Sequence, residues 1–194
     1  MENAKNELCL NILMNMLSPV YVTRPKYFPI LSMRMIHIAL EHGHNSSTPG
    51  VFSNFGLIIS SEYQQYQKAY QFGQLAIALC ERFPGSPVAC KVYCSVGFHL
   101  QHWIGPLEED FPLLVQASHI GIDTGDLLFA GYAKLMLCIE RFQRGIHLPE
   151  LLTELKAHED FATETQNPTR DTIYTLRQHI HCLLGLTPSK SCLD

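Results

Sequence analysis

The chain has 194 residues, enough for one domain with a sizeable core or for a stack of several helix pairs. Charged residues make up 16% of the chain, against about 25% in a usual soluble domain, so we expect either that other protein covers much of the surface or that the chain is one slice of a longer stack. The formal net charge is −4 and no block of Lys and Arg stands out, which disfavours a nucleic-acid-binding protein.

The cysteines and the apolar runs indicate in which cellular compartment the protein is found. The seven cysteines are odd in number and mostly lie within apolar runs, which favours reduced, buried thiols over a disulfide framework. Residues 1–7 lack the basic start and the cleavage site of a signal peptide. The longest nearly apolar run, Leu127 to Ile139, is too short to span a bilayer. We therefore expect a cytoplasmic protein that does not enter a membrane.

Turn signals divide the chain into stretches with helical spacing of apolar residues, and no convincing strand pattern appears. Only Ile58-Ile59 and residues 18–22 are weak strand candidates. Helices are predicted at 3–17, 26–42, 50–61, 64–83, 87–104, 107–123, 126–143, 148–165 and 169–185.

The residues at the ends of these stretches fit helix boundaries. Asp126 and Thr169 are predicted to cap the helices that follow them. Prolines are tolerated in a first helical turn, and glycines favour the left-handed residue at a helix end. The prolines in such places are Pro25, Pro87 and Pro149, and the glycines are Gly43, Gly105, Gly145 and Gly185.

Two small-residue patterns recur along the chain. The first is an apolar residue, two residues, another apolar residue and a glycine, and it ends at Gly56, Gly97 and Gly131. The second pairs an alanine with a glycine four residues on, as Ala69 with Gly73 and Ala117 with Gly121. Small residues on one stripe allow close approach of a neighbouring helix. We therefore predict that these seven residues form helix contacts.

The two patterns together are typical of tetratricopeptide-like helix pairs, in which the first helix offers a glycine and the second an alanine. The spacing from Gly56 to Ala69 is near that expected, whereas residues 105–112 lengthen the turn before Ala117. The sequence thus predicts an all-α fold, a right-handed superhelical stack of about four helix pairs plus a closing helix. We expect residues 1–194 to form a single helical-repeat domain.

Residues 19–185 resemble the long helical region of very large bacterial and fungal signalling proteins. In those proteins this region lies between a serine/threonine-kinase-like domain with a predicted signal-transduction ATPase and the sensor and histidine-kinase domains. The matching stretches are Met33-Arg34-Met35-Ile36 with Gly43 and Asn45, Phe55-Gly56-Leu57-Ile58, Tyr70-Gln71-Phe72-Gly73-Gln74-Leu75-Ala76, His102-Trp103, Thr124-Gly125-Asp126-Leu127 with Ala130-Gly131-Tyr132, and Arg177-Gln178.

The resemblance implies a superhelical arm beside the ATPase, where an inducer or a partner is recognised. It carries over no catalytic residue, because the phosphate loop and the kinase motifs belong to other domains and do not occur in this sequence. The chain is then either a fragment of such a protein or a stand-alone relative. We predict a non-catalytic interaction module with no cofactor, and a stand-alone adaptor unrelated to kinases is the alternative.

A small metal-dependent or thiol-dependent enzyme is the third hypothesis. Cys90, Cys94, His99 and His102 lie on one predicted helix, which cannot by itself wrap a tetrahedral zinc ion. Packed cysteines and partly exposed histidines explain this set better, and a polar turn explains the group at residues 41–44. No cysteine lies at a glycine-rich helix start, where its thiolate would be favoured. No metal site is therefore predicted.

Two further motifs have simple structural explanations. The triplet Asp123-Thr124-Gly125 copies that of aspartic proteases, but it ends a predicted helix and has no second copy. Acidic residues gather on the helix predicted at 148–165, where a solvated face is favoured over a docking site for a basic partner.

The repeat register predicts which residues bind a partner. The first helix of each pair lines the concave face of a tetratricopeptide stack, and Lys91, Phe98, Gln101 and Tyr132 fall at positions on that face. The predicted partner is a protein or a peptide, and neighbouring domains of the same protein are candidates. Leu8–Leu17 and Ile180–Leu186 would leave apolar ends, so we also expect self-association.

Overall fold

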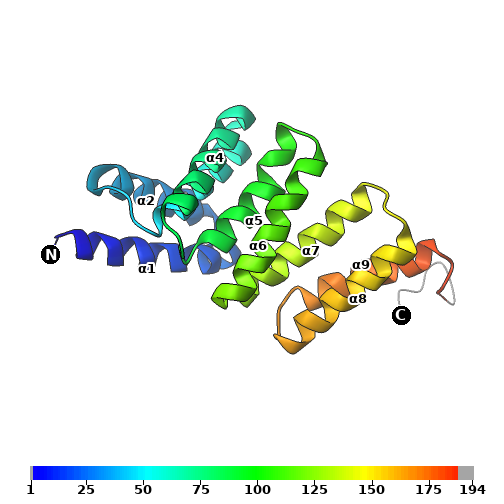
Figure 1. The fold of residues 1–194 in the computed structure, drawn as a ribbon. Helices are drawn as coiled ribbons and strands as arrows, with labels where there is room; N and C mark the ends of the chain where they lie inside the picture. The colour runs from blue at the N-terminus through cyan, green and yellow to red at the C-terminus, as the bar shows by residue number, and fades with distance from the viewer. Residues whose placement is uncertain (1, 188–194) are drawn as a thin grey trace. The chain divides into compact units, whose positions relative to one another are not determined.

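The computed structural model describes residues 2–187, and all regular structure in that range is helical, as predicted (Figure 1). Short 3-10 turns lie at Pro25–Tyr27, Gln101–Trp103 and Leu107–Glu109. The nine α-helices of the described range are α1 (Glu2–Thr23), α2 (Phe28–His42), α3 (Thr48–Tyr63), α4 (Tyr66–Arg82), α5 (Ala89–His99), α6 (Asp110–Thr124), α7 (Leu127–Gln143), α8 (Leu148–Glu164) and α9 (Arg170–Leu183).

Several predicted helix ends differ from the structure. Both weak strand candidates lie inside helices, one in α1 and the other in α3. Helix α1 runs past Pro19, where the Thr23 hydroxyl donates to the Pro19 carbonyl at 2.8 Å. The helix predicted at 87–104 stops at His99 and continues as a 3-10 turn.

Of the predicted boundary residues, Asp126 behaves as expected, whereas Thr169 and Gly105 do not. Asp126 caps α7 by accepting from the Phe129 amide at 3.4 Å, as predicted. The Thr169 side chain does not cap α9; it donates instead to Asn167 Oδ1 at 2.9 Å. Gly105 does not adopt the left-handed conformation, unlike Gly145 and Gly185. An added Cβ at Gly105 would lie 2.7 Å from Glu109 Oε2, which accepts from Gln101, so that side chain would have to shift.

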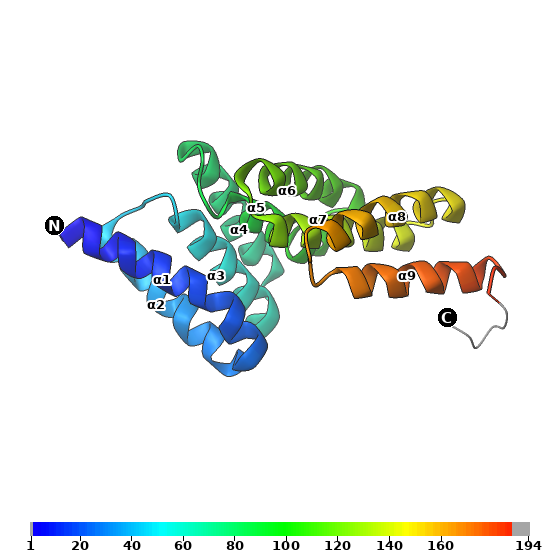
Figure 2. The same ribbon diagram turned by 90° about the horizontal axis from the view of Figure 1, so that it is seen from below.

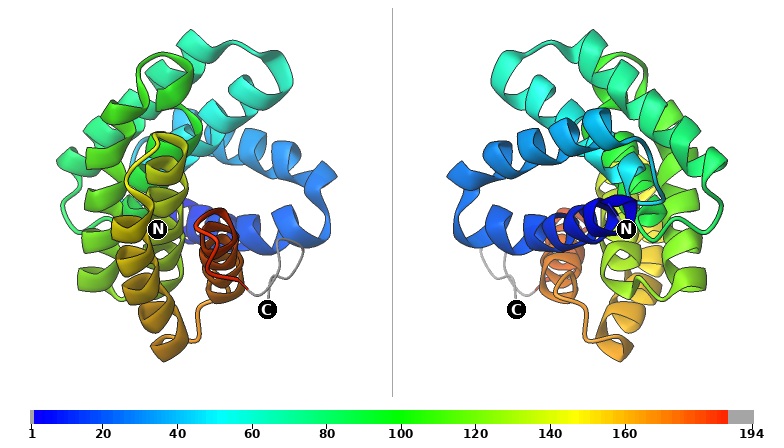
Figure 3. Two further views of the ribbon diagram at one scale, coloured as in Figure 1. Left: turned by 90° about the vertical axis from the view of Figure 1, so that its right-hand side faces the viewer. Right: turned by 90° about the vertical axis from the view of Figure 1, so that its left-hand side faces the viewer.

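The chain forms two compact units, residues 2–113 and 114–187, with the division falling within α6. The superhelical stack and its handedness stay predictions, as does the single domain. Figure 2 and Figure 3 show the elements of each unit from other sides, with α8 and α9 running side by side.

In the first unit, small residues allow α3, α4 and α5 to meet closely. A Cβ added at Gly56 would lie 2.9 Å from the Ala69 carbonyl and 3.1 Å from Leu100, and one added at Gly73 would lie 3.0 Å from Leu100. The Leu100 side chain is fully buried. The sequence pattern at Gly56, Ala69 and Gly73 therefore makes room for this one leucine.

In the second unit, α7, α8 and α9 share an apolar core. Its fully buried members include Cys138 on α7, Leu151 and Leu155 on α8, and Ile173 and Ile180 on α9. An ion pair between Arg177 and Glu159, 3.0 Å apart, ties α9 to α8 beside this core.

The same hydrogen bond recurs in both units, across 40 residues of sequence. In the first unit the Ser86 hydroxyl, just before α5, donates to the Ser46 carbonyl, just before α3, at 2.6 Å. In the second unit the Asn167 amide, just before α9, donates to the Leu127 carbonyl at the start of α7, at 2.8 Å. The two donors are 81 positions apart in the sequence, and so are the two acceptors. We therefore call a residue of the second unit equivalent to the residue 81 positions earlier, which has the corresponding place in the first unit.

A glycine lies four residues after the acceptor in each case. At Gly131 an added Cβ would lie 2.1 Å from the Asn167 amide nitrogen, so the residue must be glycine for that amide to reach α7. At the equivalent Gly50 an added Cβ would meet the flexible end of Met14 at 2.7 Å. Gly131 is thus equivalent to Gly50 and has different neighbours from Gly56, although the recurring sequence pattern groups it with Gly56.

Candidate binding groove

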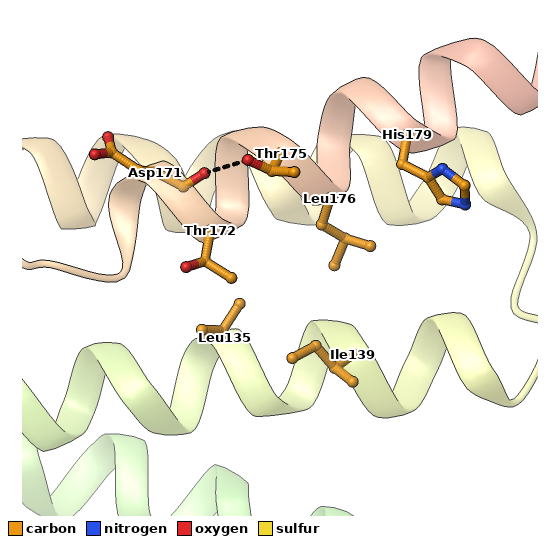
Figure 4. A pocket seen from close by; sticks show the side chains of 7 residues that line it. All are labelled: Leu135, Ile139, Asp171, Thr172, Thr175, Leu176 and His179. Carbon is orange, nitrogen blue, oxygen red and sulfur yellow. Dashed lines mark hydrogen bonds between the residues drawn. The ribbon is translucent and has the colours of Figure 1, made fainter. Parts of the chain in front are cut away.

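A groove lies between α7 and α9 in the second unit, with a volume of about 620 Å³. Figure 4 shows Leu135 and Ile139 pointing from α7 toward Thr172 and Leu176 of α9. Asp171, Thr175 and His179 complete the lining. The volume lies in the range of about 300–1,000 Å³ that is usual for ligand pockets.

The floor of the groove is apolar, and the polar groups at its rim are largely paired. The Thr175 hydroxyl donates to the Asp171 carbonyl at 2.8 Å, drawn as a dashed line in Figure 4. The Asp171 carboxylate accepts from its neighbour Arg170 at 2.8 Å. The ring of His179 meets Phe142 of α7 edge-on, with centroids 5.8 Å apart. An apolar side chain fits this lining better than a charged ligand, because few polar groups are left to compensate a charge.

The bonds of Asn167 position the two walls of the groove. Its amide nitrogen donates to the Leu127 carbonyl at 2.8 Å and to the Leu128 carbonyl at 3.3 Å. Its amide oxygen accepts from the Thr169 backbone amide at 3.1 Å. One side chain therefore fixes the start of α9 against the start of α7, while the packing of α9 on α8 fixes the rest.

The predicted partner-binding residues are divided between the two units. Lys91, Phe98 and Gln101 lie in the first unit and Tyr132 in the second. Tyr132 is half-buried on α7, one turn before Leu135 and on the same helix face as the groove floor. It meets Phe129 edge-on with centroids 5.6 Å apart.

The equivalence of the two units relates two of these residues to the groove. Lys91 and Phe98, both half-buried on α5, are 81 positions before Thr172 and His179, which line the groove. In the first unit α5 packs directly against α3, the helix equivalent to α7. Lys91 and Phe98 are thus equivalent in position to two groove residues, and their own role in partner binding stays a prediction.

Gln101 does not suit a partner-binding role. Its side chain is only 4% exposed, and its amide donates to Glu109 Oε2 at 2.6 Å. A buried amide that is already paired offers little surface to a partner. Sequence spacing missed this because the chain leaves the α5 helix before residue 101 and forms a 3-10 turn there.

The remaining residues of the two sequence patterns are buried on their helices. Gly97 lies on α5 and Gly121 on α6, and Ala117 is fully buried on α6. None of the seven small residues lies at the surface of the groove.

A cysteine and a histidine meet beside the groove wall. The distance from Cys138 Sγ on α7 to His158 Nδ1 on α8 is 3.2 Å. Burial raises the pKa of Cys138 to about 12, and burial together with Lys134 lowers the pKa of His158 to about 4. Both groups are then neutral near pH 7, and the thiol is fully buried, so the pair suits a structural contact rather than a nucleophile.

The structure of residues 2–187 shows where the candidate metal ligands and the acidic side chains of α8 lie. In that range no group of three or more His, Cys, Asp and Glu side chains is placed to hold a metal ion. Cys192 lies outside the described residues.

On α8 the acidic side chains are mostly paired, since Glu150 and Glu154 both contact Arg141 and Asp160 contacts Lys156.

None of the helices in the described part of the chain combines the length and the apolar character that a membrane span requires. The candidate site of this all-helical fold is the apolar groove between α7 and α9.

The comparisons with known proteins link the chain to a relative from signalling. The chain is 26% identical over 182 residues to the hybrid signal transduction histidine kinase G of Dictyostelium discoideum. The match covers 92% of this chain but only 5% of that protein. No family model and no solved structure matches the chain. The similarity is distant and is to a short part of a signalling protein, which is the kind of protein that the sequence resemblance named.

Proposed function

We propose that the chain is a non-catalytic interaction module of a signalling protein, and that it docks a partner segment in the groove between α7 and α9. The similarity to a segment of a signal transduction histidine kinase supports the signalling part of this proposal. The groove supports the docking part.

The chemistry of the groove favours a peptide or a helix that inserts one apolar side chain. Leu135, Ile139 and Leu176 supply an apolar floor. The Thr175 hydroxyl and the Asp171 carboxylate at the rim already have partners nearby. The groove is therefore expected to select a segment by its shape rather than by its charge. Neighbouring domains of the same protein and separate proteins are both candidate sources of such a segment.

A selection for peptides tests the docking site even though the partner is unidentified. A random peptide library displayed on phage is selected against the purified chain, and the binding of selected peptides is measured by fluorescence polarisation. We expect Thr175→Arg, which places a long charged side chain at the groove mouth, to weaken binding by about tenfold or more.

Thr153→Arg is the matched control. Thr153 is also an exposed threonine whose hydroxyl bonds the carbonyl four residues earlier, but it lies on α8, away from the groove lining. Selected peptides that bind both variants equally would contradict the proposed site.

The absence of catalysis has its own test. The sequence has no phosphate-binding loop and no kinase motif, so we expect no ATP hydrolysis and no phosphate transfer by the purified chain. Turnover of ATP that is lost with Cys138→Ser or His158→Gln would contradict this part of the proposal and would favour an enzyme.

A further inference from the structure

Helix α1 is apolar on two opposite faces. Leu10, Met14 and Leu17 form the buried face, with exposed fractions of 2–6%. Leu8, Ile12 and Met16, spaced four residues apart, form a second stripe on the other side and are 44–59% exposed. An apolar stripe on a helix is usually packed against another element. The outer stripe therefore lacks a cover within the described unit.

The contacts of α1 with α3 show which side is already occupied. The Asn54 amide on α3 lies 3.7 Å from Met14 Sδ, and the Ser47 hydroxyl donates to Asn11. The Met14 contact lies on the buried side of α1, opposite the stripe of Ile12, and the half-buried Asn11 lies between the two faces. The outer stripe is thus a separate surface from the one that holds α1 in the fold.

Helix α2 extends the apolar surface. It runs beside α1 at the N-terminal end of the unit (Figure 1 and Figure 2). Ile30, Met33 and Leu40 on α2 are 51–69% exposed. The six aliphatic side chains of the two helices, which we call the end surface, leave on the order of 500 Å² of apolar area exposed.

The size and the charge of the end surface fit a protein interface. A standard interface buries about 800 Å² per partner, of which roughly 57% is apolar, so the end surface matches the apolar part of one partner. In the α1 part, between Glu7 and Arg24, the sequence has no charged residue, whereas the exposed face of α2 also carries Arg34 and the pair of His37 with Glu41. Depletion of charge is the compositional mark of an interface core.

We propose that two copies of this chain associate through their end surfaces, with the outer stripes of the two α1 helices in contact. If the helices cross antiparallel near Ile12, Leu8 of one copy lies near Met16 of the other, and the stretch without charges avoids like-charge repulsion. A lipid surface fits less well, because membrane-surface helices carry many Lys and Arg residues beside the apolar face. This self-association is independent of the groove between α7 and α9.

Light scattering after size-exclusion chromatography of the whole chain tests the proposal. We expect the mass of a dimer at high protein concentration and a concentration-dependent return to the monomer. Ile12→Glu should raise the dimer dissociation constant by about tenfold or more, because it places a charge in the centre of the interface. Ile30→Glu should have a similar effect.

Leu75→Glu is the control, since Leu75 is 41% exposed on α4 of the same unit and lies outside the end surface. Circular dichroism checks that each variant keeps its helical content. A wild-type chain that stays monomeric at all concentrations would overturn the proposal. So would a dimer that Ile12→Glu and Ile30→Glu leave intact, or binding of the monomer to vesicles of phosphatidylcholine and phosphatidylserine.

Discussion

At the residue scale, His158 is held neutral by its surroundings. Burial is the main cause of its lowered pKa of about 4, and the Lys134 ammonium adds to it. In the unfolded chain the pKa of histidine is about 6.5. As the pH falls from about 6.5 to 4, the unfolded chain binds a proton that the folded chain does not, so the folded state loses stability.

His158→Gln should reduce this acid sensitivity. Glutamine does not ionise, so the loss of unfolding free energy between pH 7 and pH 4, up to about 3 kcal/mol for this site, should become smaller in the variant. Urea unfolding at several pH values measures the difference. An unchanged pH dependence would show that His158 is protonated at its ordinary pKa.

Asp110 has the opposite pH dependence. It is fully buried at the start of α6, and within the described residues neither carboxylate oxygen has a hydrogen-bond partner. Burial raises its pKa to about 7, and Glu109 and Glu108 contribute. From about pH 4 to pH 7 the unfolded chain ionises first, so the folded state loses stability as the pH rises, and the loss is complete above pH 7.

Asp110→Asn is therefore expected to stabilise the fold by up to about 4 kcal/mol at pH 8 and by about 1.5 kcal/mol at pH 5. At pH 5 the folded Asp110 is protonated and resembles asparagine, whereas the carboxylate of the unfolded chain has already ionised. Thermal unfolding of both proteins at the two pH values checks this. Equal stability of the two proteins at pH 8 would mean that the carboxylate has a partner in solution.

At the element scale, the contact between Asn167 and Gly131 is predicted to join α9 to α7. Gly131→Ala would force the Asn167 amide away from the Leu127 carbonyl, and we expect a loss of about 2–4 kcal/mol in unfolding free energy. In the background of Asn167→Ala the same substitution should be neutral or stabilising, since alanine is the better helix former.

The double-mutant cycle measures this coupling by urea unfolding. Gly50→Ala is a useful comparison, because its new Cβ meets only the movable end of Met14. It should cost less than Gly131→Ala. Additive effects of Gly131→Ala and Asn167→Ala would show that the two residues act independently.

The elements themselves were largely predictable from sequence, because apolar spacing and turn residues are local signals. The predicted helices at 126–143, 148–165 and 169–185 correspond to α7, α8 and α9 with shifts of one or two residues. The first helix is longer than the predicted 3–17, because α1 continues through Pro19 to Thr23.

The groove was not predictable in the same way. It depends on α9 returning beside α7, more than thirty residues later in the chain. The bond that arranges this joins a side chain to a backbone carbonyl, and its donor is serine in one unit and asparagine in the other. Such a contact leaves no common residue pattern in the sequence.

At the scale of the whole molecule, two surfaces have separate predicted tasks. The groove of the second unit is proposed to take a partner segment, and the end surface of the first unit is proposed to pair two copies of the chain. Ile12→Glu should therefore leave the affinity for selected peptides unchanged, and Thr175→Arg should leave the dimer mass unchanged. Loss of both properties in either variant would mean that the two surfaces depend on each other.

The most direct test of the docking role is a methyl NMR spectrum of Ile- and Leu-labelled chain, recorded with and without a selected peptide. If the segment binds between α7 and α9, the methyl signals of Leu135, Ile139 and Leu176 shift while those of Ile12 and Ile30 stay in place. Shifts confined to other helices, with these three leucine and isoleucine signals unchanged, would contradict the account.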